Sequence, residues 1–325
     1  MEERRLGRSG LRVSELALGT PTWGHRTDAD AAGTQLRAFL AAGGTLVDTA
    51  AHFAGGRAEE ILGDLLERAV PRREVVLATR AGLVVRSGEL VADASRATLL
   101  DQLDASLARL GTDHVDLWQL AAADAQVPFE ESLAALDHAV ATGRACYVGL
   151  VDHGGWRLAR AAIWQVADRT RAPIVADQVA YSLLNRTAEP ELVPAALDAQ
   201  VGLIAHSTLG GGLLSGKYRD ALPADSRAAL GAGAGRLAAG MEDLRAAGIV
   251  EAVATAAEGL GTTAVAVALG WVRRRPGVAS VVVSARTPTQ LTTALSALAV
   301  SLPGEIATAL DEVSTPPPGY AGDAP

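Results

Sequence analysis

Short apolar runs alternate with amphipathic stretches along most of the chain. The runs are four to eight residues long and rich in Val, Leu, Ile and Ala. Such runs are typical of strands that are buried on both faces. Eight of them occur, and they end at Thr20, Asp48, Thr79, Leu120, Val151, Ala180, Ser207 and Ser284.

The stretches between the apolar runs have the spacing of amphipathic helices. In residues 58–69, for example, Ile61, Leu62, Leu65 and Leu66 fall on one helical face. The same pattern predicts helices over residues 96–110, 129–142, 156–167, 190–200 and 287–298.

Strands buried on both faces and separated by helices indicate a parallel sheet. Eight such units in a chain of this length favour an α/β fold of the closed (β/α)8 TIM-barrel type over an open sheet. The opening "RRLGRSGLRVSE" predicts a hairpin with its turn near Gly7 and Gly10, which would plug the N-terminal end of the barrel.

We therefore expect a single barrel domain over residues 1–312. Residues 313–325, which include "STPPPGYAGDAP", are expected to form a flexible tail because prolines interrupt regular structure. The Gly- and Ala-rich residues 207–240 are expected to form a long loop over the barrel mouth.

Composition narrows the choice of partners. Hydrophobic residues make up 49% of the chain and charged residues 20%, which is the balance of a globular protein with a substantial core. The net charge of −8 argues against nucleic acid, whose phosphates require a basic face. No long apolar run and no signal segment are found, so we expect a cytoplasmic protein with no membrane partner. The single cysteine, Cys146, excludes an internal disulfide and a cysteine-rich metal site.

In barrels of this type, functional side chains follow the C-terminal ends of the strands. Asp48 and Arg80 follow neighbouring strands, which predicts an ion pair across the mouth. Such a pair either takes part in chemistry or only joins two strands, and the sequence leaves both interpretations open. The other residues at these ends are Ala121, Asp152, Gln178, His206, Ser284 and Arg286.

Several segments, in order along nearly the whole chain, carry a resemblance to a known family. They are "LGRSGLRVSELALGT", "VDTAAHFAGGRAEEILG", "LARLGTDHVDLWQL", "GRACYVGL", "ADQVAYSLLNR", "TLGGGLLSGKY" and "SARTPTQL". With these the chain resembles the aldo-keto reductases. The resemblance implies a barrel that binds NADPH across its mouth and transfers hydride to a carbonyl. It also implies a tyrosine that protonates the alkoxide, a lysine and an aspartate that lower the pKa of that tyrosine, and a histidine that orients the substrate.

Three of the four catalytic positions of the family pattern carry a different residue in this chain. The aspartate is present as Asp48, but Phe53 stands in place of the tyrosine, Arg80 in place of the lysine and Ala121 in place of the histidine. Phe53 has no proton to give. Arg80 keeps a positive charge but cannot act as an acid, because a guanidinium stays protonated above pH ~12. We therefore expect the usual reduction machinery to be lost.

The resemblance also assigns the cofactor positions. Val151 and Asp152 replace a Ser-Asn pair that holds the nicotinamide carboxamide, and His206 replaces an aromatic ring that stacks on the nicotinamide. Thr293 and Ala294 replace the Glu-Asn pair that reads the adenine. The retained positions are Gln178, Ser207, Leu209, Gly210, Lys217, Arg286 and Gln290. We expect NADP(H) binding to be weak or lost.

Three histidines are candidates for a general base near the mouth, because a neutral imidazole can take a proton near pH 7. Strand alternation aims His52 away from the mouth, and His153 is equally open to a packing role. His206 and Asp152 are therefore the better acid–base candidates, with Asp48 and Arg80 beneath them. No His-x-His or His-x3-His spacing joins the three histidines, so we expect no metal site.

Three hypotheses about function follow. The first is a small-molecule pocket used for redox-neutral acid–base chemistry such as dehydration, cyclisation or isomerisation, with Asp48, Arg80, Asp152 and His206 as its catalytic groups. The second is a non-catalytic pseudoenzyme that binds a ligand or a partner protein. The third is an NADPH-dependent oxidoreductase that takes its proton from His206 or water.

Overall fold

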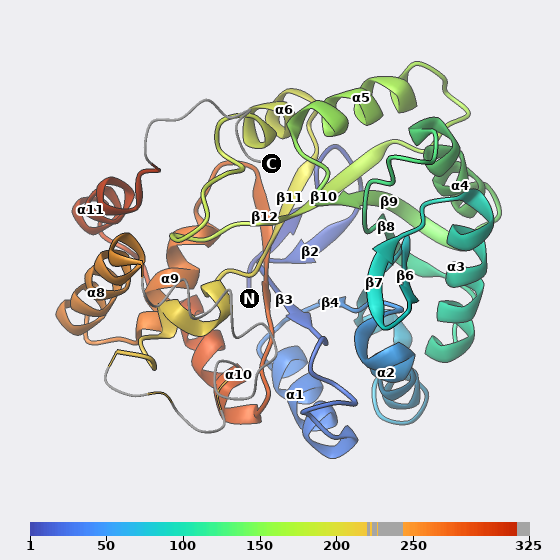
Figure 1. Cartoon of the computed structure of the whole chain (residues 1–325). Coiled ribbons are helices and arrows are strands. Elements are labelled where there is room, and N and C mark those ends of the chain that lie inside the picture. Colours follow the sequence, from blue (N-terminus) through green and yellow to red (C-terminus); the bar gives the residue numbers. More distant parts are fainter. Residues whose placement is uncertain (220–221, 223–225, 227–242, 317–325) are drawn as a thin grey trace.

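The eight apolar runs form a closed parallel barrel, surrounded by helices (Figure 1). The computed structural model describes residues 1–219, 222, 226 and 243–316. The barrel strands are β3 (Leu16–Gly19), β4 (Leu46–Asp48), β5 (Val76–Ala81), β8 (Val115–Leu120), β9 (Ala145–Val151), β10 (Ile174–Ala180), β11 (Gly202–His206) and β12 (Val278–Val283). They follow one another around the barrel in chain order, and β12 closes it by pairing with β3. The predicted TIM barrel is confirmed.

The strands are apolar because each has two buried faces. Every residue of β12 is buried, for instance, since one face lies inside the barrel and the other packs under helices. Inside the barrel, Leu46, Ala78, Leu117 and Ile204 belong to one core cluster. A larger cluster fills the space between strands and helices.

The N-terminal hairpin closes the bottom of the barrel. Strands β1 (Glu3–Arg5) and β2 (Arg12–Ser14) pair in antiparallel fashion, as the sequence predicted. Leu6, Leu11 and Val13 join the inner core cluster. A Cβ on Gly7 would lie 2.5 Å from the Val175 carbonyl oxygen, so only glycine permits this close approach to the start of β10.

The outer helices are α1 (Ala29–Ala41), α2 (Arg57–Arg68), α3 (Arg96–Leu110), α4 (Phe129–Ala141), α5 (Gly155–Val166), α6 (Leu192–Asp198), α8 (Leu244–Gly259), α9 (Ala264–Arg273), α10 (Pro288–Leu295) and α11 (Gly304–Ser314). Helices α2, α3, α4, α5, α6 and α10 overlap the predicted ranges, whereas the sequence pattern assigned no range to α1, α8, α9 and α11. Helix α3 shows why its ends were predictable: the Ser95 side chain accepts a hydrogen bond from the Thr98 amide, and Gly111 ends the helix at φ 63°.

Some elements differ from the sequence prediction or were not assigned by it. A small hairpin of β6 (Leu83–Arg86) and β7 (Glu89–Ala92) follows β5 and stands outside the barrel. Helix α11 continues to Ser314, which is buried, so the first two residues of the predicted tail are helical. Residues 317–325 of that tail lie outside the described residues, as does most of the predicted loop beyond Arg219.

No single helix within the described residues is long and apolar enough to cross a membrane. Two bent helix pairs, α8 with α9 and α10 with α11, reach the length and composition of a span only when each pair is taken together.

Candidate functional site

A buried triangle of polar side chains lies at the C-terminal ends of β4, β5 and β10. Asp48 is the last residue of β4, while Arg80 and Gln178 project from β5 and β10. The Arg80 guanidinium donates through Nη2 to Asp48 Oδ2 and through Nη1 to Gln178 Oε1. Gln178 Nε2 donates to Asp48 Oδ1 at 2.9 Å, which completes the triangle. The predicted Asp48–Arg80 ion pair is therefore confirmed.

Arg80 is held on all sides. Its Nε also faces the Thr49 carbonyl oxygen at 3.4 Å, so each of the three guanidinium nitrogens has a partner. The Phe53 ring lies against the guanidinium, with 5.4 Å from Cζ to the ring centroid. This cation–π contact places an apolar ring where the family resemblance implies a phenol.

Phe53 begins a tight 3₁₀ turn between β4 and α2. The turn needs left-handed backbone at Ala54, Gly55 and Gly56, with φ of 50°, 65° and 96°. His52 packs edge-on against Phe53 at 4.8 Å between ring centroids. Burial, followed by the positive charge of Arg80, lowers the pKa of His52 to about 4, so this imidazole is neutral near pH 7.

Ala121 directly follows β8, and its methyl side chain carries no hydrogen-bonding group. Its amide donates to the Ala81 carbonyl oxygen at 2.8 Å, which extends the β5–β8 pairing by one residue.

A second polar group, formed by Asp152, His206 and Ser207, spans the ends of β9 and β11 on either side of β10. His206 Nε2 lies 2.9 Å from Asp152 Oδ2, and His206 Nδ1 lies 3.0 Å from the Ser207 hydroxyl. Asp152 Oδ1 also accepts from the Ala180 amide at 3.0 Å, so the carboxylate is fixed to the end of β10. The three side chains form one hydrogen-bonded chain.

The electrostatics of this chain favour an ionised Asp152. Burial raises the pKa of the Asp152 carboxyl, but the hydrogen bond and charge of His206, the Ala180 amide and the charge of Arg80 outweigh it, so the net pKa is lowered. The side chains of His206 and Asp152 are 24% and 48% exposed, which leaves both within reach of a small molecule. Asp152 and Ser207 both adopt left-handed backbone, with φ of 54° each. Such strained positions recur at functional sites.

His153 has a structural role. Its ring is 1% exposed, stacks on Phe129 at 5.7 Å between centroids, and bonds through Nδ1 to the Val151 carbonyl oxygen at 2.8 Å. Burial is the main reason that its pKa falls to about 4. The packing alternative for this histidine therefore agrees with the structure.

The residues that the family resemblance assigns to the cofactor phosphates form a turn after β11. Leu209 precedes the 3₁₀ turn Gly210–Ser215, in which Gly210, Gly211 and Gly212 have φ of 54°, 70° and 102°. A Cβ on Gly212 would lie 2.8 Å from Lys217 Nζ, so the glycine makes room for the ammonium group. On the adenosine side, Gln290 Oε1 accepts from the Arg286 amide at 2.9 Å. The cationic side chains of Lys217 and Arg286 are of the type that pairs with phosphate groups.

The residues that the resemblance assigns to the nicotinamide do not suit its carboxamide group. The amide of Gln178 is already bonded to Arg80 and Asp48. Val151 is buried and apolar, and the Asp152 carboxylate accepts but cannot donate to a carboxamide oxygen. These residues therefore do not hold a nicotinamide carboxamide in the way that the family resemblance implies.

One acidic residue of β10 was not assigned a role from the sequence. Asp177 precedes Gln178, is fully buried, and has no hydrogen-bond partner for either carboxylate oxygen among the described residues. An acid inside a strand whose other residues, apart from Gln178, are apolar was the signal that could have marked it. The phenol of Tyr181, which follows β10, has a packing role, because its hydroxyl donates to Glu189 at 2.7 Å and its ring packs on Trp271.

The comparisons with known proteins agree on one family. The model of the Aldo/keto reductase family matches residues 15–315. The chain is 34% identical to the "Uncharacterized oxidoreductase YrpG" of Bacillus subtilis over 100% of this chain and 98% of that protein. It is 35% identical to the "L-glyceraldehyde 3-phosphate reductase" of Escherichia coli O157:H7 over 70% of this chain and 67% of that protein.

A further relative has a name that refers to a channel subunit and not to a reaction. The chain is 33% identical to a "Probable voltage-gated potassium channel subunit beta" of Oryza sativa subsp. japonica, over 92% of each chain. Members of the family generally bind small molecules and use NADP(H). The matched span and the closed barrel with its helical shell leave one assignment: this chain belongs to the aldo/keto reductase family.

Proposed function

We propose that this protein uses the barrel mouth for redox-neutral acid–base chemistry on a small carbonyl compound, such as an isomerisation, a dehydration or a cyclisation. The observation that carries the proposal is the hydrogen-bonded chain Asp152–His206–Ser207 at the mouth. The proposal includes the loss of the family's reduction machinery, for which Phe53 and Ala121 are the grounds.

The direction of the hydrogen bonds defines the role of His206. An ionised Asp152 can only accept, so a neutral imidazole carries its proton on Nε2 and leaves Nδ1 as the basic nitrogen. Nδ1 can then take a proton from a substrate, either directly or through the Ser207 hydroxyl, which is 3.0 Å away. The Asp152 carboxylate stabilises the imidazolium that results, and the same nitrogen returns the proton at another atom.

Asp48 and Arg80 serve as a fixed charge pair beneath this chain in the proposal. The guanidinium contributes to the lowered pKa of Asp152, so its field reaches the acid–base group. It holds no proton that can be transferred at neutral pH.

The test is proton exchange without added cofactor. The purified protein is incubated in D₂O with a panel of small ketones, aldehydes and hydroxy-carbonyl compounds, and deuterium incorporation next to the carbonyl is followed by NMR. We expect exchange of at least one compound, with the rate lowered about 100-fold or more in His206→Ala. His138→Ala, an exposed histidine on α4, is the matched control and should exchange at the wild-type rate. Absence of exchange across the panel, or equal exchange in His206→Ala, would contradict the proposal.

A second candidate function is an NADPH-dependent oxidoreductase, and the retained turn with Lys217, together with Arg286 and Gln290, favours it. Titration with NADPH, followed by quenching of the five tryptophans and by calorimetry, separates the two. The redox-neutral proposal expects a dissociation constant well above the micromolar range. Tight binding together with NADPH consumption on a carbonyl would favour the second candidate, whereas neither binding nor exchange would favour a non-catalytic barrel with a protein partner.

A further inference from the structure

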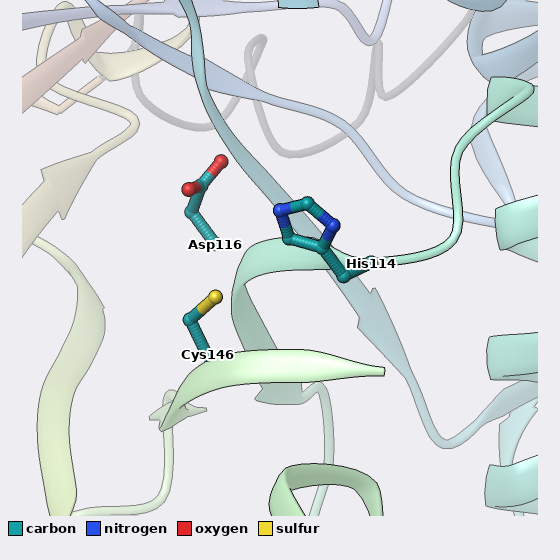
Figure 2. Close-up of side chains that lie close together, drawn as sticks. All are labelled: His114, Asp116 and Cys146. Atoms are coloured by element: carbon teal, nitrogen blue, oxygen red, sulfur yellow. The ribbon is translucent and has the colours of Figure 1, made fainter. Parts of the chain in front are cut away.

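Three metal-ligating side chains meet at the N-terminal ends of β8 and β9, at the end of the barrel opposite the mouth (Figure 2). They are His114, Asp116 and Cys146, and their donor atoms all lie within 4.8 Å of one another. Figure 2 shows the three side chains directed into one shared space, from two neighbouring segments of the chain.

The strand register explains why these residues come together. Val115 pairs with Ala145, and Leu117 pairs with Tyr147, so Asp116 and Cys146 occupy matching positions on adjacent parallel strands. Cross-strand neighbours project from the same face of a sheet. His114 lies two residues before Asp116 and therefore shares that face. The cluster is fixed by backbone pairing and not by a flexible loop.

Neighbouring groups already orient two of the three ligands. His114 Nδ1 is bonded to Asp113 Oδ1 at 2.7 Å, which leaves Nε2 for a ligand. Asp116 Oδ2 accepts from the Leu77 amide and from Arg72 Nη2, each at 2.8 Å, which leaves Oδ1. A carboxylate behind a histidine and hydrogen bonds behind a ligating carboxylate are the usual outer shell of a metal site.

We propose that His114 Nε2, Asp116 Oδ1 and the Cys146 thiolate bind one Zn²⁺ ion, with water as the fourth ligand. Nitrogen, oxygen and thiolate sulfur are the donors that Zn²⁺ prefers. Bond lengths of about 2.0–2.3 Å place tetrahedral ligands about 3.3–3.8 Å apart, so the side chains must close by roughly 1 Å. Cys146 is exposed and His114 is half-exposed, which leaves both free to make that adjustment. Binding releases the thiol proton to solvent.

The surroundings admit an ion. A surface hollow of about 550 Å³ includes His114 and Asp116 in its lining, along with Arg72 and Val76. The positive charge of Arg72 opposes a cation, but the Asp113 carboxylate behind His114 offsets it. The thiolate and the Asp116 carboxylate then balance the charge of the metal. The proposed site differs from the sequence expectation of no metal, because that expectation compared only the spacings of histidines along the chain.

The test uses the full-length protein after treatment with a chelator. We expect calorimetry with Zn²⁺ to show one equivalent bound with a dissociation constant in the micromolar range or tighter. We expect Co²⁺ to give a near-ultraviolet thiolate-to-metal absorption band. Cys146→Ser should abolish that band, and His114→Ala should weaken Zn²⁺ binding by about 10-fold or more.

Two controls make the result decisive. His138→Ala removes an exposed histidine elsewhere and should leave Zn²⁺ affinity unchanged. Asp113→Ala should weaken binding without removing a ligand, because it loosens the orientation of the His114 ring. The proposal is overturned if wild-type protein binds no Zn²⁺, or if Cys146→Ser and His114→Ala bind it as tightly as wild type.

Discussion

The Nε2 atom of His206 lies 2.9 Å from the Oδ2 atom of Asp152, although 53 residues separate the two along the chain and a whole strand lies between their strands. Asp152 reaches this position because its second oxygen is bonded to the Ala180 amide at the end of β10. A partly exposed imidazole with a fixed carboxylate partner can exchange protons with a ligand while keeping its orientation.

Replacing Asp152 by Asn should impair the proposed proton exchange without unfolding the protein. The Asn side chain keeps the shape but can donate to His206 Nε2, which would move the ring proton to Nδ1 and block the basic nitrogen. We expect the exchange rate to fall by about 100-fold or more, with an unchanged urea midpoint. Asp64→Asn, at an exposed position on α2, is the matched control. A wild-type exchange rate in Asp152→Asn would show that the Asp152–His206 pair only joins the ends of β9 and β11.

Breaking the buried Asp48–Arg80 pair should lower the free energy of unfolding. In Arg80→Met, Asp48 remains buried with an uncompensated charge, and removal of one partner from a buried pair costs about 3–5 kcal/mol. The double variant Asp48→Leu with Arg80→Met removes both charges and should recover at least half of that loss. Urea unfolding of the three proteins measures both values. A double variant less stable than Arg80→Met would show that the pair itself stabilises the fold.

The barrel and most helices could be predicted because their signals are local. Apolar strand runs, the serine cap of α3 and the glycine that ends it all act within a few residues. The Asp48–Arg80 pair was predictable for a related reason, since the two residues end adjacent parallel strands.

The remaining contacts depend on distances that no local pattern contains. The resemblance assigns Gln178 to the cofactor but does not predict that its amide also joins Asp48 and Arg80 across the barrel. Ser207 was assigned to a phosphate turn, yet its hydroxyl bonds to His206. The cluster at Cys146 depends on the register between β8 and β9, which the periodicity of either strand alone does not fix.

Asp177 should make the protein less stable as the pH rises. Burial, with a smaller contribution from the charge of Asp152, raises the pKa of Asp177 well above its ordinary value. The unfolded chain therefore loses this proton near pH ~4 while the folded chain keeps it, and the free energy of unfolding falls by about 1.4 kcal/mol per pH unit above that point. The fall ends once the pH passes the folded-state pKa.

Asp177→Asn removes this titration. We expect the variant to gain stability relative to wild type between pH 5 and pH 8, as measured by urea unfolding at several pH values. Asp64→Asn again serves as the control, since its exposed carboxylate should give no pH-dependent difference. Parallel stability curves for Asp177→Asn and wild type over this range would refute the assignment of a protonated Asp177.

His153 should make the protein less stable as the pH falls, which is the opposite of the trend expected from Asp177. Its folded-state pKa is about 4, whereas an unfolded histidine titrates near pH ~6.5, so the unfolded chain binds the extra proton first as the pH falls. Stability from this group is complete above pH ~6.5 and is lost between there and pH ~4. His153→Asn keeps a donor for the Val151 carbonyl but cannot titrate. We expect its urea midpoint to fall less than that of wild type between pH 6.5 and pH 4.5. An equal fall in both proteins would exclude a buried neutral imidazole at this position.

Restoring a phenol at Phe53 should not by itself restore carbonyl reduction. The Arg80 Cζ atom lies 5.4 Å from the centroid of the Phe53 ring. In Phe53→Tyr the new ring would take the same place, so a proton donor would return close to a positive charge. The nicotinamide side would remain unsuited to its carboxamide, because Gln178 stays bonded to Asp48 and Arg80. We therefore expect Phe53→Tyr to show no NADPH consumption above wild type with a panel of aldehydes and ketones, followed at 340 nm.

The combined variant Phe53→Tyr, Asp152→Asn and Val151→Ser, which adds donors for the carboxamide, should gain measurable NADPH binding by calorimetry. Consumption of NADPH by Phe53→Tyr alone would instead mean that the cofactor already binds productively, and that the missing phenol was the only barrier to reduction.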